Sequence, residues 1–560
     1  MVPSVASAGF VLVLLSLQAR ADAGPRSSTD VQAAAIHEVY AEPVLPFDTD
    51  ETEPAATDSL AQAIAEAYEG NPSLGARRYD LRATDDNLGV AMSGLRMSAQ
   101  LQVSGGYDYT DPGRTTQATR SLADRLNSPY IERNDLGAQL VVDQPLSTGG
   151  RTHAAISAAR ADIRAGREAL RGSEGDLLVE LIGAYADVRR DDRALQIREK
   201  NAQVLAATLD EVIARREAGE LTRTDIAQAQ TQLQSAYVQL NAARAQLEQS
   251  RAAFTAMVGR EPGVLAPPPP LPLVPRSIDE AFDSADQFNP DLAGAIQAER
   301  ASRARIAVAR ADGHPTLLLR AVAGATGPAV PFDRHEEDLS LSGRATLTIP
   351  LSAGGRIAAQ IHQTLDQNSA DRLRIEAARR EMVRNIVSAW NQMVTADRNE
   401  NVQRTQLKAA RIYYEGTFQE YRAGLRTTFD VLYAQNSLRE TEIALLANAR
   451  DQYVARAMLL RHIGQLEVSK LLTGNALHDP AAHVRAIERR GALPWDAAIH
   501  ALDRIAAPGQ GQQRIETPER LPDKPDMAPA GAAEPDPPLI TSSPITPIPG
   551  TTGQPLKSRH

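Results

Sequence analysis

The fold is decided by the stretch Arg216-Glu-Ala-Gly-Glu-Leu-Thr-Arg-Thr-Asp-Ile-Ala-Gln-Ala-Gln230, which recurs as Tyr421-Arg-Ala-Gly-Leu-Arg-Thr-Thr-Phe-Asp-Val-Leu-Tyr-Ala-Gln435. Gly219 and Gly424 hold the same place in the two copies, 205 residues apart (424 − 219). Glycine suits the left-handed residue that commonly follows a helix. Each copy therefore predicts the end of a helix.

The residues after each glycine predict the start of a second helix. Thr222-x-x-Asp225 and Thr427-x-x-Asp430 resemble capping boxes, with aspartate in place of the usual glutamate or glutamine. Each copy thus predicts the tip of a helical hairpin. Two such tips in one chain indicate an internal duplication.

Four segments, at about 99–109, 135–146, 316–326 and 338–350, alternate between apolar and polar residues. The last is the most regular, because its odd positions are apolar or glycine and its even positions are mostly polar. Each segment predicts a strand with one apolar and one polar face. About ten residues suit a tilted strand that crosses a bilayer. The alternative is a soluble antiparallel sheet that packs on a helix.

A near-identical phrase ends the second strand of each pair, Gln144-Pro-Leu-Ser-Thr-Gly-Gly-Arg151 and Ile349-Pro-Leu-Ser-Ala-Gly-Gly-Arg356. We expect proline to end the strand and the glycine pair to turn the chain. The predicted turn residues are Pro145, Gly149, Gly150, Pro350, Gly354 and Gly355. Long helical hairpins are expected to follow, at 151–257 and 356–463. Their first helices, of about 67 residues, would each be about 100 Å long.

Composition and pattern divide the chain into six segments. We expect a signal peptide at 1–23, an acidic linker at 24–57, a first repeat at 58–266, a Pro-rich linker at 267–277, a second repeat at 278–475 and a Pro-rich, largely disordered tail at 476–560. The alternative for the apolar N-terminal run is a buried helix segment.

Composition narrows the classes of function. The chain of 560 residues has no cysteine, which excludes disulfides, thiolate metal sites and a lipid anchor on cysteine. Its net charge is −10 without a long basic run, so we expect no nucleic-acid partner. The ten histidines are scattered, and His335-Glu-Glu337 indicates a solvated charge cluster. We therefore expect neither an enzyme nor a site for a cofactor or metal.

The predicted strands set a condition on assembly. Four strands are too few to close a barrel, and open strand edges are not tolerated in lipid. If the strands cross a membrane, several chains must share one barrel. The long helices likewise need partners along their length, and an oligomeric duct satisfies both requirements.

With these motifs in this order, residues 58 to 475 resemble the TolC family of outer-membrane exit ducts. The resemblance implies an all-α coiled-coil tube in the periplasm and a transmembrane β-barrel (an α+β membrane protein), its 12 strands shared by a homotrimer. It implies a cell outer-membrane location with a long periplasmic extension in contact with lipid. It also implies a periplasmic adaptor (membrane fusion) protein as a partner and an ABC or RND pump in the inner membrane. Drug efflux and type I protein secretion both fit.

The resemblance also assigns roles at the hairpin tips. The periplasmic gate would comprise Thr224, Asp225, Tyr421, Arg426 and Asp430, with Asp430 in a ring of carboxylates. The tips, which would contact the adaptor, carry Gly219, Leu221, Gly424 and Leu425. A second carboxylate of some members falls on Tyr433, so this sequence departs from the pattern there. Two alternatives remain: Asp225 and Asp430 are only helix caps, or the chain is a non-conducting, trimeric coiled-coil structural or adhesin-like protein.

Overall fold

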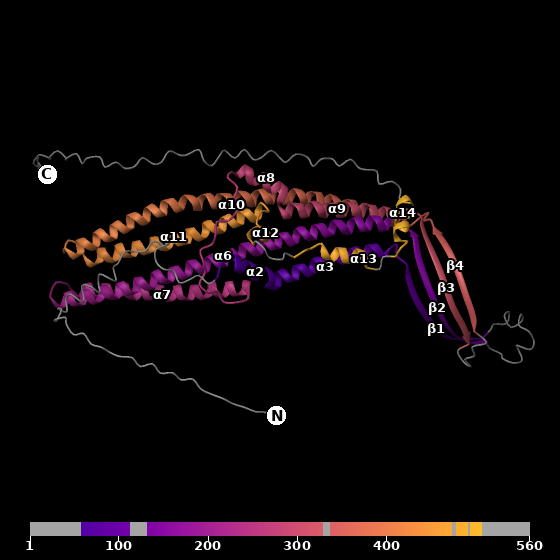
Figure 1. Cartoon of the computed structure of the whole chain (residues 1–560), viewed down its shortest axis with the longest axis horizontal. Helices are drawn as coiled ribbons and strands as arrows, with labels where there is room; N and C mark the ends of the chain where they lie inside the picture. The colour runs from indigo at the N-terminus through magenta and orange to yellow at the C-terminus, as the bar shows by residue number, and fades with distance from the viewer. Residues whose placement is uncertain (1–57, 112–130, 329–336, 473–477, 491–492, 507–560) are drawn as a thin grey trace, which may run out of the picture. The chain divides into compact units, whose positions relative to one another are not determined.

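A computed structural model describes residues 58–111, 131–328, 337–472, 478–490 and 493–506 (Figure 1). The first repeat comprises α2 (Leu60–Gly70), α3 (Pro72–Ser93), β1 (Ser98–Thr110), β2 (Ile131–Ser147), α6 (Arg151–Glu217) and α7 (Arg223–Val258). The second comprises α8 (Ile278–Phe288), α9 (Pro290–Ala311), β3 (Thr316–Pro328), β4 (Asp338–Thr348), α10 (Arg356–Arg422) and α11 (Thr428–His462). Three short helices follow: α12 (Val468–Leu471), α13 (Ala482–Arg489) and α14 (Asp496–Ala506).

The two repeats match element for element, which confirms the predicted duplication. α6 and α10 each have 67 residues, and α3 and α9 each have 22. Asn71 and Asn289 cap the N-termini of α3 and α9, each followed by proline in the first turn of its helix. The predicted signal peptide and acidic linker, and the tail from 507 onward, lie outside the described residues, as do His335 and Glu336.

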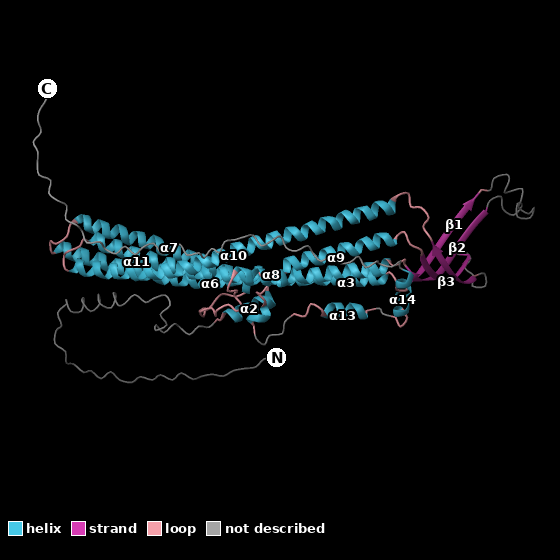
Figure 2. Cartoon of the chain, turned by 90° about the horizontal axis from the view of Figure 1, so that it is seen from above, coloured by secondary structure: helices cyan, strands magenta, loops and turns pink. Residues whose placement is uncertain are grey.

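The long helices form two hairpins. α7, of 36 residues, lies beside the half of α6 that leads to its tip, and α11, of 35 residues, lies beside the corresponding half of α10 (Figure 2). α6 also packs on α9 and α11, so it joins the two repeats. None of the helices in the described part of the chain is long and apolar enough to cross a membrane.

A hydrophobic core forms where α2 and α8 meet the long helices. The apolar stripe of α6 is fully inside it, since Leu178, Leu181, Tyr185 and Val188, spaced three, four and three residues apart, are all at most 4% exposed. The Tyr185 hydroxyl donates to the carbonyl oxygens of Asp58 and Ala266 at 3.2 and 2.7 Å. This bond ties the start of the first repeat and the linker between the repeats to α6.

The four strands form one antiparallel sheet in the order β1-β2-β3-β4. β2 begins four residues before the predicted position and continues through Pro145 to Ser147, with a shift of register between these two residues. The prediction that Pro145 ends the strand is therefore wrong, because the bulge accommodates its missing N–H. β4 ends at Thr348, two residues before the prediction.

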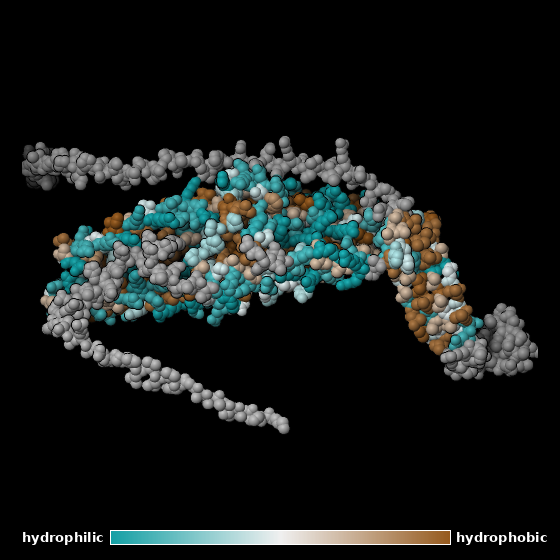
Figure 3. Space-filling view, viewed as in Figure 1, coloured by the Kyte–Doolittle hydropathy of each residue, from teal (hydrophilic) through white to brown (hydrophobic). Residues whose placement is uncertain are grey.

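The register gives the sheet one polar and one apolar face. Leu101, Leu140, Ala323 and Leu341 align on one face, whereas Gln102, Gln139, Gly324 and Ser340 align on the other. Hydrophobic residues gather over the strands, and the helices are mainly hydrophilic outside (Figure 3). The exposed leucines of the apolar face, such as Leu339 at 88% and Leu341 at 84%, need a nonpolar environment.

α13 and α14 correct the prediction of a largely disordered segment from 476 onward. Ile487 of α13 packs against Gly89 of α3. Asp503 of α14 is fully buried and accepts hydrogen bonds from the backbone N–H groups of Thr148 and Gly150 at 2.7 and 3.3 Å. Gly150 is the N-cap of α6 and has no side chain, so the Thr148 hydroxyl accepts from the N–H of Thr152 in the first turn, and Asp503 holds the preceding turn from a distant part of the chain.

The two faces of the sheet make opposite predictions for the same substitution. Leu347→Arg places a charge on the apolar face and should cost about 2–4 kcal/mol if that residue lies near the middle of a bilayer. Thr346→Arg, on the polar face of the same strand, should leave assembly unchanged. The yield of folded oligomer from the membrane measures both. Equal yields for the two variants would contradict the assignment of the faces.

Candidate channel gate and interhelical seam

The tip between α6 and α7 is built as its sequence predicts. Gly219 has a φ of 85°, and the N–H of Glu220 donates to the carbonyl of Arg215 at 2.9 Å, which closes α6. The Thr222 hydroxyl accepts from the N–H of Asp225 at 3.4 Å, and Asp225 accepts from the N–H of Thr222 at 2.8 Å. This capping box begins α7.

The second tip repeats the same geometry. Gly424 has a φ of 76°, and the N–H of Leu425 donates to the carbonyl of Glu420 at 2.8 Å. Asp430 accepts from the N–H of Thr427 at 3.0 Å and forms the capping box of α11. Both aspartates are therefore helix caps in the described chain, and capping does not prevent either from also lining a channel.

The capping bonds favour the ionised aspartates. The backbone N–H of Thr222 lowers the pKa of Asp225, and the Thr427 hydroxyl lowers the pKa of Asp430. A lowered folded-state pKa contributes stability that is fully present above the ordinary aspartate pKa of 3.8 and is lost as the pH falls through the lowered value. Both caps thus persist at neutral pH, each with a negative charge at a hairpin tip.

The described chain does not bring Arg426 to Asp225. Its Nε donates to Glu420 at 2.7 Å, and both side chains are about half exposed. Tyr421 is buried, with the guanidinium of Arg215 5.0 Å from its ring centre. Glu420 and Arg215 were not among the predicted site residues. The signal for Glu420 was its charge, opposite to that of Arg426 and placed across the turning glycine.

The remaining predicted tip residues lie at the surface. Thr224 is exposed, Leu221 is half-buried, and a side chain added at Gly219 or Gly424 would meet open space. Leu425 is 77% exposed. It is followed on α11 by Phe429 and Tyr433, whose exposed rings stack 6.2 Å apart. The second tip therefore presents a cluster of apolar groups that the described part of the chain leaves exposed.

The strand-to-helix turns differ between the repeats. Gly149, Gly150, Gly354 and Gly355 all have positive φ, as their predicted role requires. The first turn is enclosed, since a side chain at Gly149 would meet His314 at 2.7 Å. The second is exposed, and no described residue binds it as Asp503 binds the first.

A polar seam between α6 and α11, which the sequence analysis missed, joins the two hairpins. Its rungs are Asp176 with Arg461 at 2.6 Å, Asp187 with Arg450 at 2.9 Å, Arg198 with Glu440 at 3.0 Å and Asn201 with Gln435 at 2.9 Å. Residue numbers rise along α6 as they fall along α11, so the helices are antiparallel. Arg450 and Arg461 of α11 are 11 residues apart, as are Asp176 and Asp187 of α6. Eleven residues span about three helical turns. This spacing was the available signal.

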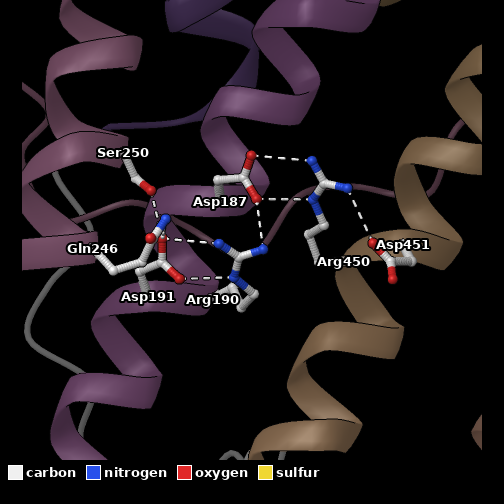
Figure 4. Close-up of polar contacts among 7 residues, drawn as sticks. All are labelled: Asp187, Arg190, Asp191, Gln246, Ser250, Arg450 and Asp451. Carbon is white, nitrogen blue, oxygen red and sulfur yellow. Dashed lines mark hydrogen bonds and ion pairs between the residues drawn. The ribbon is translucent and has the colours of Figure 1, made fainter. Parts of the chain in front are cut away.

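The rung at Asp187 extends to a third helix (Figure 4). Asp187 binds Arg450 through two bonds and Arg190 through a third, at 2.9 Å. Arg190 also binds Asp191, which accepts hydrogen bonds from Ser250 and Gln246 of α7. A connected polar network therefore holds α6, α7 and α11 in one register.

Comparisons with known proteins agree with this architecture. The family model of the outer membrane efflux proteins matches residues 63–260 and 281–465. The chain is 30% identical to the outer membrane efflux protein BepC of Brucella suis over 434 residues, 78% of this chain and 91% of BepC. It is 24% identical to the alkaline protease secretion protein AprF of Pseudomonas aeruginosa, over 74% of this chain and 87% of AprF.

A solved structure has the same fold. The Campylobacter jejuni CmeC outer membrane channel superposes with a TM-score of 0.65 at 14% identity, over 77% of this chain and 89% of that channel. At this identity the likeness concerns the fold alone.

The seam makes a prediction about stability. Asp187→Asn leaves Arg450 with its exposed partner Asp451 alone, so it should lower the free energy of unfolding by about 1–3 kcal/mol. Asp451→Asn removes the solvated partner of the same arginine and should cost less than about 1 kcal/mol. Denaturant unfolding followed by helical circular dichroism measures both. Equal losses of unfolding free energy in the two variants would show that the pair between Asp187 and Arg450 contributes no more than a surface ion pair.

Proposed function

This chain belongs to the outer membrane efflux protein family, and from that premise we propose that three copies form one continuous exit duct. The chain is an outer-membrane protein that serves efflux or secretion. The observation that carries the trimeric duct is the four-stranded sheet with two unpaired edges and an apolar face. Three such sheets supply 12 strands, enough to close a barrel around the polar faces.

The helical hairpins continue the duct into the periplasm. In the described chain much of α10 is exposed along the half nearer the strands, and copies of α6 and α7 in a neighbouring chain offer a surface that covers it. We assign the partners by the same proposal: a periplasmic adaptor protein at the tips, and an inner-membrane pump of the ABC or RND class. The exposed apolar cluster at Leu425, Phe429 and Tyr433 is the part of the tip suited to such a partner.

The tips close the duct at rest in this proposal. Only the Nε of Arg426 is bonded within the described chain, so its two terminal nitrogens remain available for Thr224 and Asp225 of a neighbouring tip. Tyr421 supports the turn from which Arg426 projects. Asp430 lines the closed mouth while it caps α11.

The gate is tested by single-channel conductance in planar bilayers. Arg426→Ser with Tyr421→Phe should raise conductance several-fold, because it removes bonds that threefold symmetry repeats. Arg422→Ser removes the same charge from the last turn of α10 and serves as the matched control, with conductance unchanged. No conductance from purified trimers of any variant would overturn the duct, whereas equal conductance in all three would overturn only the gate.

The carboxylate ring is tested with a pair of matched caps. Asp225→Ala removes the capping box of α7, and Asp430→Ala removes the equivalent capping box of α11. The two variants should lower the thermal midpoint of unfolding by similar amounts. Only Asp430→Ala should weaken block by hexamminecobalt, a trivalent cation, because only Asp430 lines the mouth. If hexamminecobalt blocks Asp430→Ala as strongly as the unaltered protein, Asp430 is a cap and nothing more.

A further inference from the structure

A row of charged side chains crosses the polar face of the sheet. Asp143 of β2 pairs in register with Arg320 of β3, and Arg320 pairs with Arg344 of β4. Each residue is four positions from the strand end that leads to a helix, about 13 Å along the strand. The three side chains thus lie at one level, on a face that otherwise carries mostly serine, threonine, glutamine and glycine, with Val141, Leu318 and Val322 beside the row.

The charges of this row do not cancel. Arg320 donates Nε and a terminal nitrogen to the two oxygens of Asp143 at 2.6 and 2.9 Å, a bidentate pair. Arg344 is exposed and makes no hydrogen bond or ion pair with any residue that the structure describes. The row therefore carries one uncompensated positive charge in each chain.

The placement of Arg344 opposite Arg320 is unfavourable for the sheet alone. Like charges directly across two strands repel each other, and Asp143 neutralises only one of the pair. β4 is an edge strand, so Arg344 next faces β1 of a neighbouring chain. The only carboxylate on the polar face of β1 is Asp108, ten residues from the row's level at Ser98. The neighbouring β1 thus offers Arg344 only uncharged side chains near its level.

We propose that Asp143, Arg320 and Arg344 form an anion-binding ring inside the barrel. This inference rests on the proposed trimeric duct, in which threefold symmetry places three copies of the row at one level of the lumen. Guanidinium groups bind phosphate, sulfate and carboxylate oxygens through paired donors. The ligand class is therefore the anionic groups of molecules that pass through the duct.

The remaining charges on this face give the ring a direction. Among the side chains that the structure describes, the other ionisable groups on the polar face are Asp108, Asp135 and Asp338. All three carboxylates lie toward the strand ends away from the helices. The positive row is thus the charged level of this face that lies nearer the helices, where an anion entering from the helices is held.

The absence of cysteine from the chain allows a clean test. Ser342→Cys introduces a thiol two residues from Arg344 on the same face, about 7 Å away. The rates at which an anionic and a cationic methanethiosulfonate reagent modify this thiol report the local potential. The measurement is made on the full-length trimer in detergent, at low salt and again at about 1 M salt, where screening acts within about 3 Å.

Two further substitutions should move the ratio of anionic to cationic rates in opposite directions. Arg344→Gln should lower it several-fold, and Asp143→Asn should raise it several-fold because Arg320 loses its counterion. Arg344→Lys should retain it. Tripolyphosphate should slow the anionic reagent when Arg344 is present and have several-fold less effect in Arg344→Gln. All differences should vanish at high salt.

Each other outcome overturns a defined part of the account. Ratios that do not change among these variants, or no effect of tripolyphosphate, would overturn the anion ring and leave the duct intact. Leu341→Cys, on the apolar face, is the matched control and should react slowly with both reagents. A thiol that is accessible at Leu341 but not at Ser342 would overturn the lumen itself, and with it the proposed duct.

Discussion

The two edges of the four-stranded sheet constrain everything else in this chain. β1 and β4 each expose a row of backbone N–H and C=O groups on their outer sides, next to a face of exposed leucines. Lipid satisfies the leucines but cannot satisfy the backbone groups. In the proposed duct the edges pair with the edges of other chains, and the membrane part of the protein is then complete only as an assembly.

The helices are joined so that one chain enters this assembly as a unit. The seam of Asp176, Asp187 and Arg198 on α6 fixes α11 in register, and the buried Asp503 fixes the turn from β2 into α6. At the second tip the ion pair between Arg426 and Glu420 is about half exposed. Polar links along the helices and a solvated ion pair at the second tip suit the proposed opening of the duct at its periplasmic end.

The sequence predicts those parts of the fold that local chemistry determines. Gly219 and Thr222 specify a tip with residues close in the chain, and alternation specifies the faces of β4. Prediction from sequence fails where the partner is remote in the chain. Asp503 binds a turn more than 350 positions away, and Arg450 pairs with Asp187, which is 263 positions away. Single aspartates and arginines are too common to reveal such pairs. Within the described chain Arg426 pairs with Glu420, only six positions away.

The shared barrel is tested most directly by crosslinking the edges of neighbouring chains. Gln102→Cys on β1 is combined in turn with Ser340→Cys, Ser342→Cys and Thr346→Cys on β4, in a chain without native cysteine. On oxidation, at least one combination should give a covalent trimer on a denaturing gel without reductant, and none of the single variants should. Disulfides that form only within one chain, or no interchain disulfide at any of these positions, would contradict the account.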